Sequence, residues 1–467
     1  MQKGVAQVTE GFSRIDEELC TGCGNCVKTC PTDAISGELH KPHVISEERC
    51  VSCGRCVQVC CAYDTIFQEF PTSRAKRMEQ RGLPAGTKEP LFAAYNRFCL
   101  AEVQAALADP NLVVMAQLGP AVSGALAEDF GMPTGSISTG RILGALKKLG
   151  FRKTYSYTLP AALAVLEQAQ ELAERLQSGK ILPVINASCP AAVKYIEQSY
   201  PELIHYLAPS KSPHQIAGTL LKSYVARQLK LNPAQVYSVS IGPCTSRKFE
   251  ITRPELNSDG IQSVDAALTA RELACLIKDS GIDLMTAPEA DFDAELPVIA
   301  GMDNIYCTPG DIATAVLNAS RDMMAQGSGD PLDVKFTETG TEGVRTASVE
   351  IGSFAISAAA ITGLTGAVPY FDAMKSGRHE LAFMELLACP MGCVSGGGQP
   401  KILLPQDKPV AYAERAKLHC SLDAKLLSAL SRHPAVQQIY QDFFGKPCGD
   451  KSNRALHTQY VERKLSQ

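Results

Sequence analysis

The chain has 467 residues, of which 45% are hydrophobic and 20% are charged, and its formal net charge is −4 at pH 7. A chain of this length predicts about two to four domains with a sizeable hydrophobic core. The balanced charge excludes the strongly basic surface of a nucleic-acid-binding protein. It also gives no reason to expect an anionic membrane as a partner.

The beginning of the chain, MQKGVAQVTEGFSRIDEELC, contains no apolar segment of the kind found in a signal peptide. We therefore expect a cytoplasmic protein. Residues 351–371 carry no charge, but their small residues and Pro369 make this stretch only weakly hydrophobic. We expect a buried strand followed by the start of a helix there, rather than a membrane span.

Two cysteine runs stand near the N-terminus: CTGCGNCVKTC, residues 20–30, and CVSCGRCVQVCC, residues 50–61. Both contain the spacing C-x₂-C-x₂-C-x₃-C. In doubled runs of this kind, the fourth cysteine of each run ligates the cluster held by the other run. The pattern predicts one 4Fe–4S cluster on Cys20, Cys23, Cys26 and Cys60, and a second on Cys50, Cys53, Cys56 and Cys30. The alternative is a pair of zinc sites.

This N-terminal block resembles the dicluster bacterial-type ferredoxins, in which two neighbouring clusters conduct single electrons. We expect residues 1–72 to form such a small α+β domain, with Cys61 surplus to its eight ligands. Residues 73–90 are rich in charge and contain Pro and Gly, which predicts a linker. Extracellular disulfides could also explain 18 cysteines, but the metal-type spacing favours reduced thiols.

From about residue 91 the pattern becomes α/β, and three predicted buried strands each run directly into a cysteine. Strands at 182–188, 236–243 and 383–388 lead into Cys189, Cys244 and Cys389, and Cys393 follows on the next turn. Ligands gather at the carboxyl ends of parallel strands, so we expect these four thiols to form a third metal-binding set. The alternative is that each is an ordinary buried thiol. Helices are predicted over 136–150 and 160–179.

At these cysteines the chain resembles the iron-only (FeFe) hydrogenases. The segments that carry the resemblance are NASCPAAVKYIEQSYPELIHYLAPSKSPHQ, GPCTSRKFEITRPEL, ELLACPMGCVSGGGQP and the closing FFGKPCGDKSNRALHTQY. The resemblance implies an α/β catalytic domain over residues 91–400, with two lobes of parallel sheet around a buried cluster. It also implies a C-terminal helical wrap over residues 401–467.

The resemblance implies a composite cofactor in addition to the two ferredoxin-type clusters. Cys189, Cys244, Cys389 and Cys393 would hold a third 4Fe–4S cube, and Cys393 would bridge it to a diiron subcluster. That subcluster carries CO, cyanide and a bridging dithiolate amine. The residues that would contact this cofactor are Gly242, Pro243, Gly396, Gly397 and Gln399.

The family's proton relay is altered here. The cysteine that precedes the first cluster ligand is Ser188, and a serine hydroxyl is a far weaker acid than a thiol, which titrates at about 8.5. Alignment of VLEQAQEL with the family's helix puts Gln168 at the first relay glutamate and keeps Glu171 at the second. The relay serine becomes Ala208, while Arg175 matches an arginine near the exit. Three of the five relay positions are therefore changed.

The pocket around the diiron site also differs from the family. Methionines are replaced by Gly242 and Leu387, a tryptophan by Ala192, and the lysine that donates to a cyanide by Arg247. The segment IYCTPGD brings Cys307 beside the diiron site. We leave open whether Cys307 is an inert buried thiol or a substitute proton carrier.

Other cysteines and the histidines give weaker signals. His214 replaces a family glutamine near the cyanide, whereas the eight histidines as a set lack metal-ligand spacing and are expected to be structural or exposed. Cys420 and Cys448 lie in the C-terminal segment. They are either ordinary thiols or ligands of something that the rest of the family lacks.

These observations predict an FeFe-hydrogenase of low turnover, with Cys393, Ser188, Glu171, Arg247 and Cys307 at its catalytic centre. It would interconvert protons and H₂ and take electrons from a ferredoxin-like carrier, and it would need diiron-site maturation proteins. Loss of the relay cysteine resembles sensory branches of the family, so a hydrogen or redox sensor with a signalling partner is one alternative. An iron–sulfur carrier or assembly factor without the diiron site is another.

Overall fold

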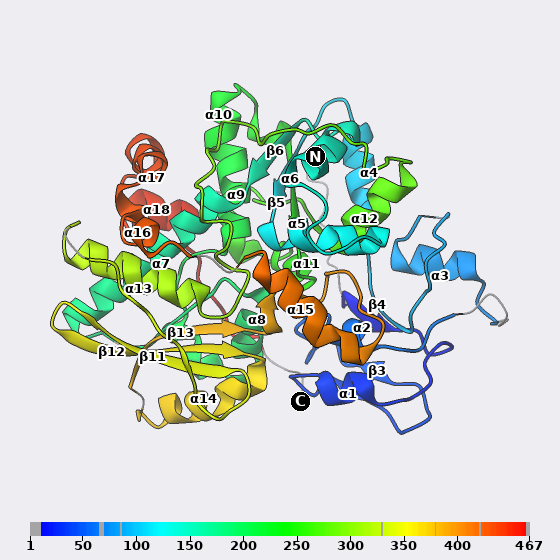
Figure 1. Ribbon diagram of the computed structural model, residues 1–467, viewed down its shortest axis with the longest axis horizontal. Coiled ribbons are helices and arrows are strands. Elements are labelled where there is room, and N and C mark those ends of the chain that lie inside the picture. Colours follow the sequence, from blue (N-terminus) through cyan, green and yellow to red (C-terminus); the bar gives the residue numbers. More distant parts are fainter. Residues whose placement is uncertain are drawn as a thin grey trace.

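The computed structural model describes residues 11–64, 70–84, 86–180, 182–258, 260–327, 330–378, 380–419 and 422–463. Two lobes, each built on its own sheet, lie beside a small N-terminal block (Figure 1). The two-lobed α/β architecture predicted from the sequence is confirmed. No helix in these described stretches is both long enough and apolar enough to span a bilayer.

The first lobe contains a parallel four-stranded sheet in the order β6-β5-β8-β9. Its strands supply aliphatic residues to a buried core and also bury the polar Gln117, Ser238 and Ser240, as expected for strands that are covered on both faces. The strands are β5 (Val113–Leu118), β6 (Lys153–Ser156), β8 (Val236–Gly242) and β9 (Ala266–Thr269). The helices packed around them are α4 (Leu100–Ala108), α5 (Pro120–Ala125), α6 (Thr139–Lys148), α11 (Ser246–Glu250) and α12 (Ala270–Asp279).

The second lobe has a five-stranded sheet in the order β10-β11-β12-β13-β7. This sheet is mixed rather than wholly parallel, because β11 and β12 form a hairpin across a two-residue turn at Gly352, where φ is 61°. The strands β12, β13 and β7 are parallel. Their bounds are β7 (Val184–Ile185), β10 (Thr337–Glu338), β11 (Val344–Ile351), β12 (Phe354–Thr362) and β13 (Leu381–Leu387).

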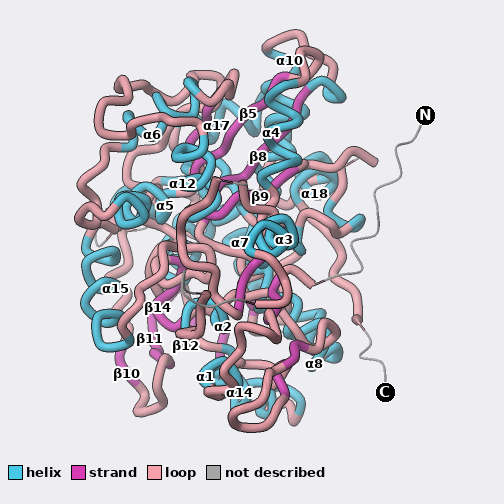
Figure 2. The backbone as a smooth tube through the Cα atoms, turned by 90° about the vertical axis from the view of Figure 1, so that its right-hand side faces the viewer, coloured by secondary structure: helices cyan, strands magenta, loops and turns pink. Residues whose placement is uncertain are grey.

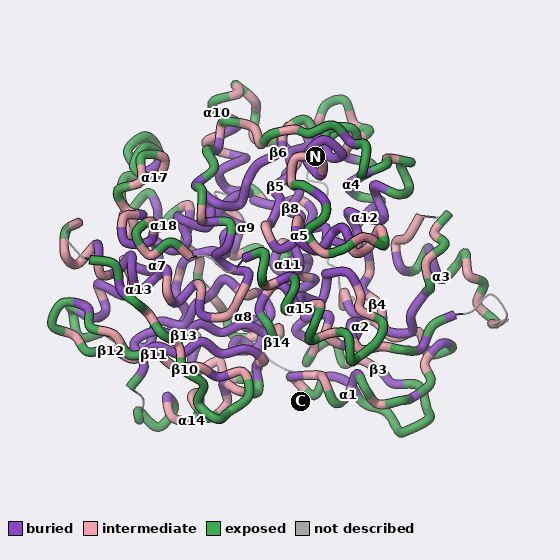
Figure 3. Tube along the Cα trace, viewed as in Figure 1, coloured by how far each residue is buried: buried purple, intermediate pink, exposed green. Residues whose placement is uncertain are grey.

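Helix α7 (Thr158–Ser178) leaves the first lobe after β6 and becomes the central helix of the second. It packs against α9 (Pro213–Leu220) and α13 (Asp311–Met324), and most of its residues are buried (Figure 3). The helices predicted over 136–150 and 160–179 correspond to α6 and α7. The remaining helices of this lobe are α8 (Pro190–Ser199), α10 (Ala226–Gln228) and α14 (Val368–Lys375).

The N-terminal block is a compact unit with two short helices, one after each cysteine loop. Gly24 and Gly54 stand directly before these helices with φ of 76° and 74°, a backbone region that glycine enters without a steric penalty. The elements are β1 (Ser13–Ile15), α1 (Asn25–Thr29), β2 (Ile35–Ser36), β3 (Val44–Ile45), α2 (Arg55–Val59), α3 (Arg74–Arg81) and β4 (Ala94–Asn96).

The segment predicted as a linker is folded over much of its length. Helix α3 begins at its Ser73 cap, and its Arg77 and Arg81 side chains are buried against Asp16, each at 3.0 Å. Strand β4 then pairs with β1 in an antiparallel arrangement. Charge and proline content suggested a solvated linker, but buried ion pairs hold this segment to the N-terminal block.

The C-terminal segment crosses the molecule. Helix α15 (Lys408–Lys417) runs over the region between the lobes, and three shorter helices pack on the second lobe (Figures 1 and 2). Arg415 fastens α15 because it pairs with Glu128 at 2.6 Å and donates to the carbonyl oxygen of Val394 at 3.0 Å. The shorter helices are α16 (Ala424–Leu427), α17 (Pro434–Ile439) and α18 (Asp450–Leu456).

A buried carboxyl in the second lobe gives a prediction for stability. Glu385 on β13 accepts hydrogen bonds from the backbone N–H groups of Gly310 and Ala313 at 2.9 Å, yet burial raises its pKa from 4.5 to about 7. Since the folded state favours the neutral acid, the contribution of Glu385 to the free energy of unfolding is fully present below pH 4.5 and is lost as the pH rises through about 7. The loss is at most about 3 kcal/mol.

We therefore expect the thermal unfolding midpoint of the Glu385→Gln variant to depend less on pH between 5 and 8 than that of the unmodified protein. The measurement is a series of unfolding scans across this range. Parallel pH profiles for the two proteins would disprove the assignment.

Candidate metal centres and active site

The fourth cysteine of each N-terminal run lies beside the first three cysteines of the other run. Burial, together with the nearby thiols of Cys20, Cys60 and Cys23, raises the pKa of Cys26 to about 11. These four residues are the predicted first set. The structure therefore brings Cys60, from the second run, beside the first.

The second set forms in the same way. Burial raises the pKa of the Cys56 thiol well above its usual value, and Cys53, Cys50 and Cys30 add to this effect. Cys61 lies outside both sets, with its sulfur 4.0 Å from that of Cys23, and both of these residues are exposed.

The third set forms where the two lobes meet. Cys189 caps α8 after β7, Cys244 follows β8, and Cys389 follows β13. Burial raises the pKa of Cys389, and the next largest causes are the thiols of Cys244, Cys189 and Cys393. The strand ends predicted from the sequence thus converge. Strand β7 itself has only two residues.

The number and kind of donors in these sets suit clusters. Each set supplies four cysteines, and a cubane binds four thiolates, one at each of its four irons.

Without a bound metal, the thiols of the third set are expected to stay protonated. Burial raises the pKa of Cys189 to about 11 and that of Cys393 to about 12. Backbone hydrogen bonds from the N–H groups of Ala388, Ala192 and Ala191 lower the pKa of Cys189 and partly offset the effect of burial. Metal ligation must therefore supply the positive charge that deprotonates these buried thiols.

The second set is close to the third. Cys53 is among the groups whose charge raises the pKa of Cys389. Lys194 on α8 donates to the carbonyl oxygen of Cys50 at 2.6 Å and ties the two regions together. Cluster ligands of the N-terminal block and of the lobes are therefore neighbours, as an electron path requires.

The glycine triplet after Cys393 allows three backbones to meet. A Cβ atom on Gly397 would lie 2.1 Å from the carbonyl oxygen of Cys53, and one on Gly396 would lie 2.4 Å from that of Pro243. Gln399 anchors the end of this loop by donating to the carbonyl oxygen of Ala121 at 2.7 Å. The contacts observed at the triplet are thus with the N-terminal block and the first lobe.

This contact gives a second prediction. The Gly397→Ala variant must push the loop away from Cys53, at a cost of about 1–3 kcal/mol typical of overpacking. We expect a lower unfolding temperature and slower reduction of the active site through the N-terminal clusters. Gly86→Ala is the control, because a Cβ on Gly86 meets nothing within 4 Å. Equal behaviour of the two variants would argue against this contact.

Arg247 provides a buried cationic donor beside the third set. Its guanidinium donates to the hydroxyl of Tyr157 at 2.5 Å, and its Nε has no hydrogen-bond partner in the protein. A Cβ and larger side chain on Gly242 would meet the Arg247 side chain, whose Cδ lies 3.4 Å away. The Arg247 side chain therefore lies against the bare backbone of Gly242.

The predicted relay residues are not joined by a continuous chain of hydrogen bonds. Ser188 Oγ lies 3.5 Å from Gln168 Nε2 and 3.5 Å from the hydroxyl of Tyr306. Both distances are long for hydrogen bonds. Gln168 Oε1 is buried without a partner, whereas Glu171 pairs with Arg175 at 2.7 Å. Ala208 is fully buried, and its N–H group donates to the carbonyl oxygen of Ile185 at 2.8 Å.

Cys307 is fully buried and belongs to a small apolar group with Ala121 and Val394, against which Cys393 packs. Its thiol donates to the carbonyl oxygen of Asp303 at 3.5 Å. The position beside Cys393 agrees with the sequence-based expectation, but both interpretations of Cys307 remain predictions.

Sequence reasoning did not single out several polar neighbours of this site. Tyr157 and Tyr306 are large, buried and hydrogen-bonded to Arg247 and Ser188. His214, which the sequence did single out, lies 2.9 Å from the Glu250 carboxylate, and burial lowers its pKa. No signal in the sequence distinguishes these tyrosines from ordinary core aromatics, because their partners come from distant segments.

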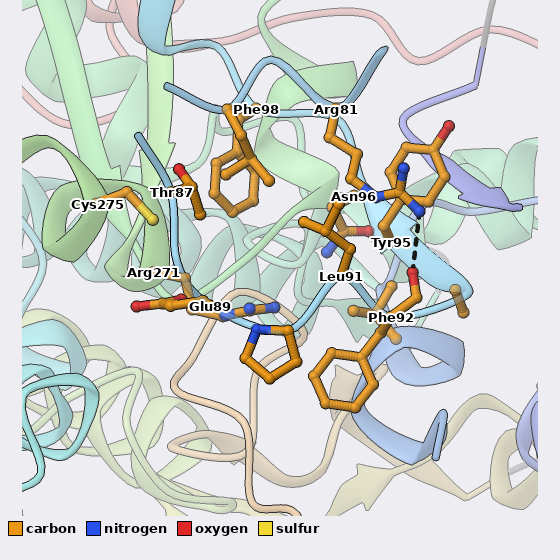
Figure 4. A pocket seen from close by; sticks show the side chains of 14 residues that line it. Arg81, Thr87, Glu89, Leu91, Phe92, Tyr95, Asn96, Phe98, Arg271 and Cys275 are labelled. Carbon is orange, nitrogen blue, oxygen red and sulfur yellow. Dashed lines mark hydrogen bonds between the residues drawn. The ribbon is translucent and has the colours of Figure 1, made fainter. Parts of the chain in front are cut away.

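A separate pocket lies where the N-terminal block meets α12 (Figure 4). Arg81, Tyr95, Asn96, Arg271 and Cys275 are among its lining residues. Its volume of about 30 Å³ is close to that of one water molecule. The pocket is therefore too small for an organic substrate.

Comparison with known families supports the assignment of the lobes. The family model described as the iron only hydrogenase large subunit, C-terminal domain, matches residues 112–397. The chain belongs to this iron-only hydrogenase family. A 4Fe–4S binding domain matches residues 13–36, and the iron hydrogenase small subunit matches residues 428–463. This hydrogenase-family chain therefore carries large-subunit and small-subunit sequence in one polypeptide.

Several individual proteins also resemble the chain. The chain is 36% identical over 420 residues to the large subunit of a periplasmic iron hydrogenase of Nitratidesulfovibrio vulgaris, covering 90% of this chain and 93% of that protein. It is 26% identical over 386 residues to the cytosolic iron–sulfur assembly component 3 of Mus musculus, covering 77% and 76%. A solved FeFe-hydrogenase of Chlamydomonas reinhardtii superimposes with a TM-score of 0.70 at 27% identity, covering 78% of this chain and 99% of that one.

These matches establish an iron–sulfur, metal-binding oxidoreductase family for the chain, with the FeFe-hydrogenase active-site cluster as the family's cofactor. The residues present fit that cofactor. Four thiols converge, and the buried Arg247 Nε and Gln168 Oε1 beside them lack protein partners. Cys420 lies outside the described residues.

Proposed function

We propose that the chain catalyses the reversible reaction 2H⁺ + 2e⁻ ⇌ H₂ and does so slowly. The observation that carries the proposal is the convergence of Cys189, Cys244, Cys389 and Cys393 with a buried arginine beside Cys393. The family's catalytic cluster needs such a four-thiolate set. The small apolar group of Ala121, Cys307 and Val394 packs against Cys393 and would shield that side of the cluster from water.

The diiron group, when bound through Cys393, would supply the open coordination position at which hydrogen is bound or released. The chain's own residues would orient this group and hold protons near it. Arg247, held by Tyr157, would donate hydrogen bonds to an anionic ligand of that group, as its unpartnered Nε allows. Ser188 would hold the first proton on the inner side of the relay.

Two 4Fe–4S clusters in the N-terminal block and one in the lobes would carry the electrons. The neighbouring positions of Cys53 and Cys389 support transfer between the second and third clusters. The first cluster, whose ligand Cys23 is exposed, would accept electrons from a ferredoxin-like protein. Maturation proteins would deliver the diiron group.

Slow turnover follows from the interrupted relay. An amide at Gln168 and a methyl group at Ala208 cannot pass protons as a carboxylate and a hydroxyl do. A positioned proton-transfer group contributes about 10²–10⁴-fold to a rate. The reduced rate also favours a sensory role, in which hydrogen or the redox state changes the cluster and a partner protein responds.

The competing proposal is an iron–sulfur carrier of the kind represented by the assembly component of Mus musculus. The retained Arg247 argues against it, since a cubane carrier needs no cation beside its cluster, whereas Cys393 would serve as the fourth cubane ligand in either case.

The test is an assay of hydrogen production. Purified protein is supplied with iron and sulfide, then with a synthetic diiron cofactor, and reduced viologen is the electron donor. We expect hydrogen production above that of protein without the diiron cofactor, at a rate well below that of a hydrogenase with a cysteine relay. No production at all would remove the enzymatic proposal, and a rate equal to that hydrogenase would remove the attenuation.

A further inference from the structure

A carboxylate, a thiol and an imidazole from three segments meet on helix α7, outside the sites described above. One ligand atom each of Glu167, Cys448 and His457 lies within 4.8 Å of the other two. Glu167 is fully buried on α7, Cys448 lies in the loop before α18, and His457 directly follows α18. Within the part of the chain that the structure describes, this is the one such group.

The three side chains already face one another. His457 Nε2 is 2.7 Å from Glu167 Oε2, and the Cys448 sulfur is 3.4 Å from the main-chain oxygen of Glu167. The N–H group of Cys448 donates to the same carboxylate at 2.8 Å. Cys448 has a φ of 50°, a region that few residues other than glycine adopt, so its position is held by these contacts.

Outer contacts orient the group as they do around metal ligands. The Tyr440 hydroxyl donates to Glu167 Oε1 at 2.7 Å, which leaves the other carboxylate oxygen facing Cys448 and His457. Asn453 donates to the main-chain oxygen of Cys448 at 3.2 Å. A pocket of about 360 Å³ is lined by Leu166, the neighbour of Glu167, and by Tyr440, Gly445, Lys446 and Pro447. The pocket lies next to the group, although none of the three proposed ligands lines it.

We propose that Glu167, Cys448 and His457 bind a zinc-type divalent cation that fastens the C-terminal segment to α7. Thiolate, imidazole and carboxylate together suit Zn²⁺ or Co²⁺, whereas Mg²⁺ and Ca²⁺ take oxygen ligands. The charges balance, because one carboxylate and one thiolate neutralise a divalent ion while the imidazole is neutral. Water would complete a tetrahedral site.

Binding must displace two protons from the ligand atoms. The thiol proton leaves to solvent, and the proton between His457 and Glu167 either leaves or moves to the other imidazole nitrogen. No electron transfer is involved. The proposal is independent of hydrogen chemistry, and it concerns how the small-subunit-like segment, residues 428–463, is held to the second lobe.

A simple ion pair between His457 and Glu167 is the competing explanation. It accounts for the imidazole and the carboxylate, and in it the Cys448 thiol would only donate a weak hydrogen bond to the main-chain oxygen of Glu167. Removal of the thiol therefore separates the two explanations, because the His457–Glu167 pair survives in a Cys448→Ala variant and folding should be preserved.

The test is a Co²⁺ titration of protein whose iron–sulfur clusters are fully loaded, so that the cluster thiols are occupied. We expect near-ultraviolet absorption from thiolate-to-cobalt charge transfer that saturates at about one Co²⁺ per chain and that Zn²⁺ abolishes. Cys448→Ala and His457→Gln should eliminate it. Tyr440→Phe should weaken binding about tenfold or more.

Cys275→Ala is the matched control, because Cys275 is another buried thiol that lies on α12 beside the small pocket (Figure 4). This variant should keep the full cobalt spectrum, and cluster absorbance checks that each variant is folded. The proposal is overturned if the unmodified protein takes up no cobalt or if Cys448→Ala gives an unchanged spectrum.

Discussion

Replacement of Cys393 by alanine is expected to reduce hydrogen production to the level of protein without a diiron cofactor. Cys393 is the thiol that packs against the apolar group of Cys307 and lies beside Arg247. Its loss removes one ligand of the third cluster and the proposed bridge to the diiron group. The two N-terminal clusters have separate ligands and should remain. Iron content, electron paramagnetic resonance and the viologen assay measure these effects together.

Cys307→Ala is the control for this change. It removes a fully buried thiol from the same apolar group and leaves all four converging cysteines in place. The diiron cofactor should still bind in this variant. Retained hydrogen production in Cys393→Ala would mean that the bridging role has been assigned to the wrong residue.

Restoration of the proton relay should raise the rate of hydrogen production. In the double variant Ser188→Cys/Gln168→Glu, a thiol and a carboxylate replace two groups that now lie 3.5 Å apart and transfer protons poorly. We expect turnover to rise about 10²-fold, the lower end of what a positioned proton-transfer group contributes, because Ala208 still interrupts the path. The measurement is steady-state hydrogen evolution at saturating reductant.

Ser188→Ala is the comparison for this experiment. If the serine hydroxyl carries few protons, this variant should differ little from the unmodified protein. A strong loss in Ser188→Ala, or no gain in the double variant, would indicate that proton transfer at Ser188 does not limit the rate.

The convergence of the third cysteine set could be predicted because its signal lies in the strands. Apolar runs that end in Cys189, Cys244 and Cys389 predict strand ends that carry ligands, and β8 and β13 have nearly the predicted bounds. These ends meet across the two lobes rather than at one sheet edge, because β8 belongs to the first sheet and β7 and β13 to the second. The exchange of Cys30 and Cys60 between the two runs could be predicted for a similar reason, since the spacing of each run leaves its fourth cysteine facing away.

Other features depend on contacts that no local pattern carries. Strand β7 is only two residues long, and directly after it the Asn186 side chain accepts a hydrogen bond from the N–H group of Ser188 at 3.1 Å. Glu385 lies within an apolar run, and only the start of α13 supplies its N–H partners.

The histidines illustrate the same limit. None has a partner at metal-ligand spacing in the sequence, yet the fold brings His457 to Glu167 across 290 residues. The Cys448 loop reaches the same carboxylate from 281 residues away. Tertiary packing alone creates this group, so sequence reasoning could only leave the role of Cys448 open.

The central claim is that four distant thiols hold an iron–sulfur cluster joined through Cys393 to a diiron group. Infrared spectroscopy tests it most directly, because CO and cyanide bound to iron absorb where protein does not. After reconstitution with a synthetic diiron cofactor and removal of the excess, we predict sharp CO and cyanide bands in the unmodified protein and none in Cys393→Ala. Absence of these bands from the unmodified protein, or their persistence in Cys393→Ala, would contradict the claim.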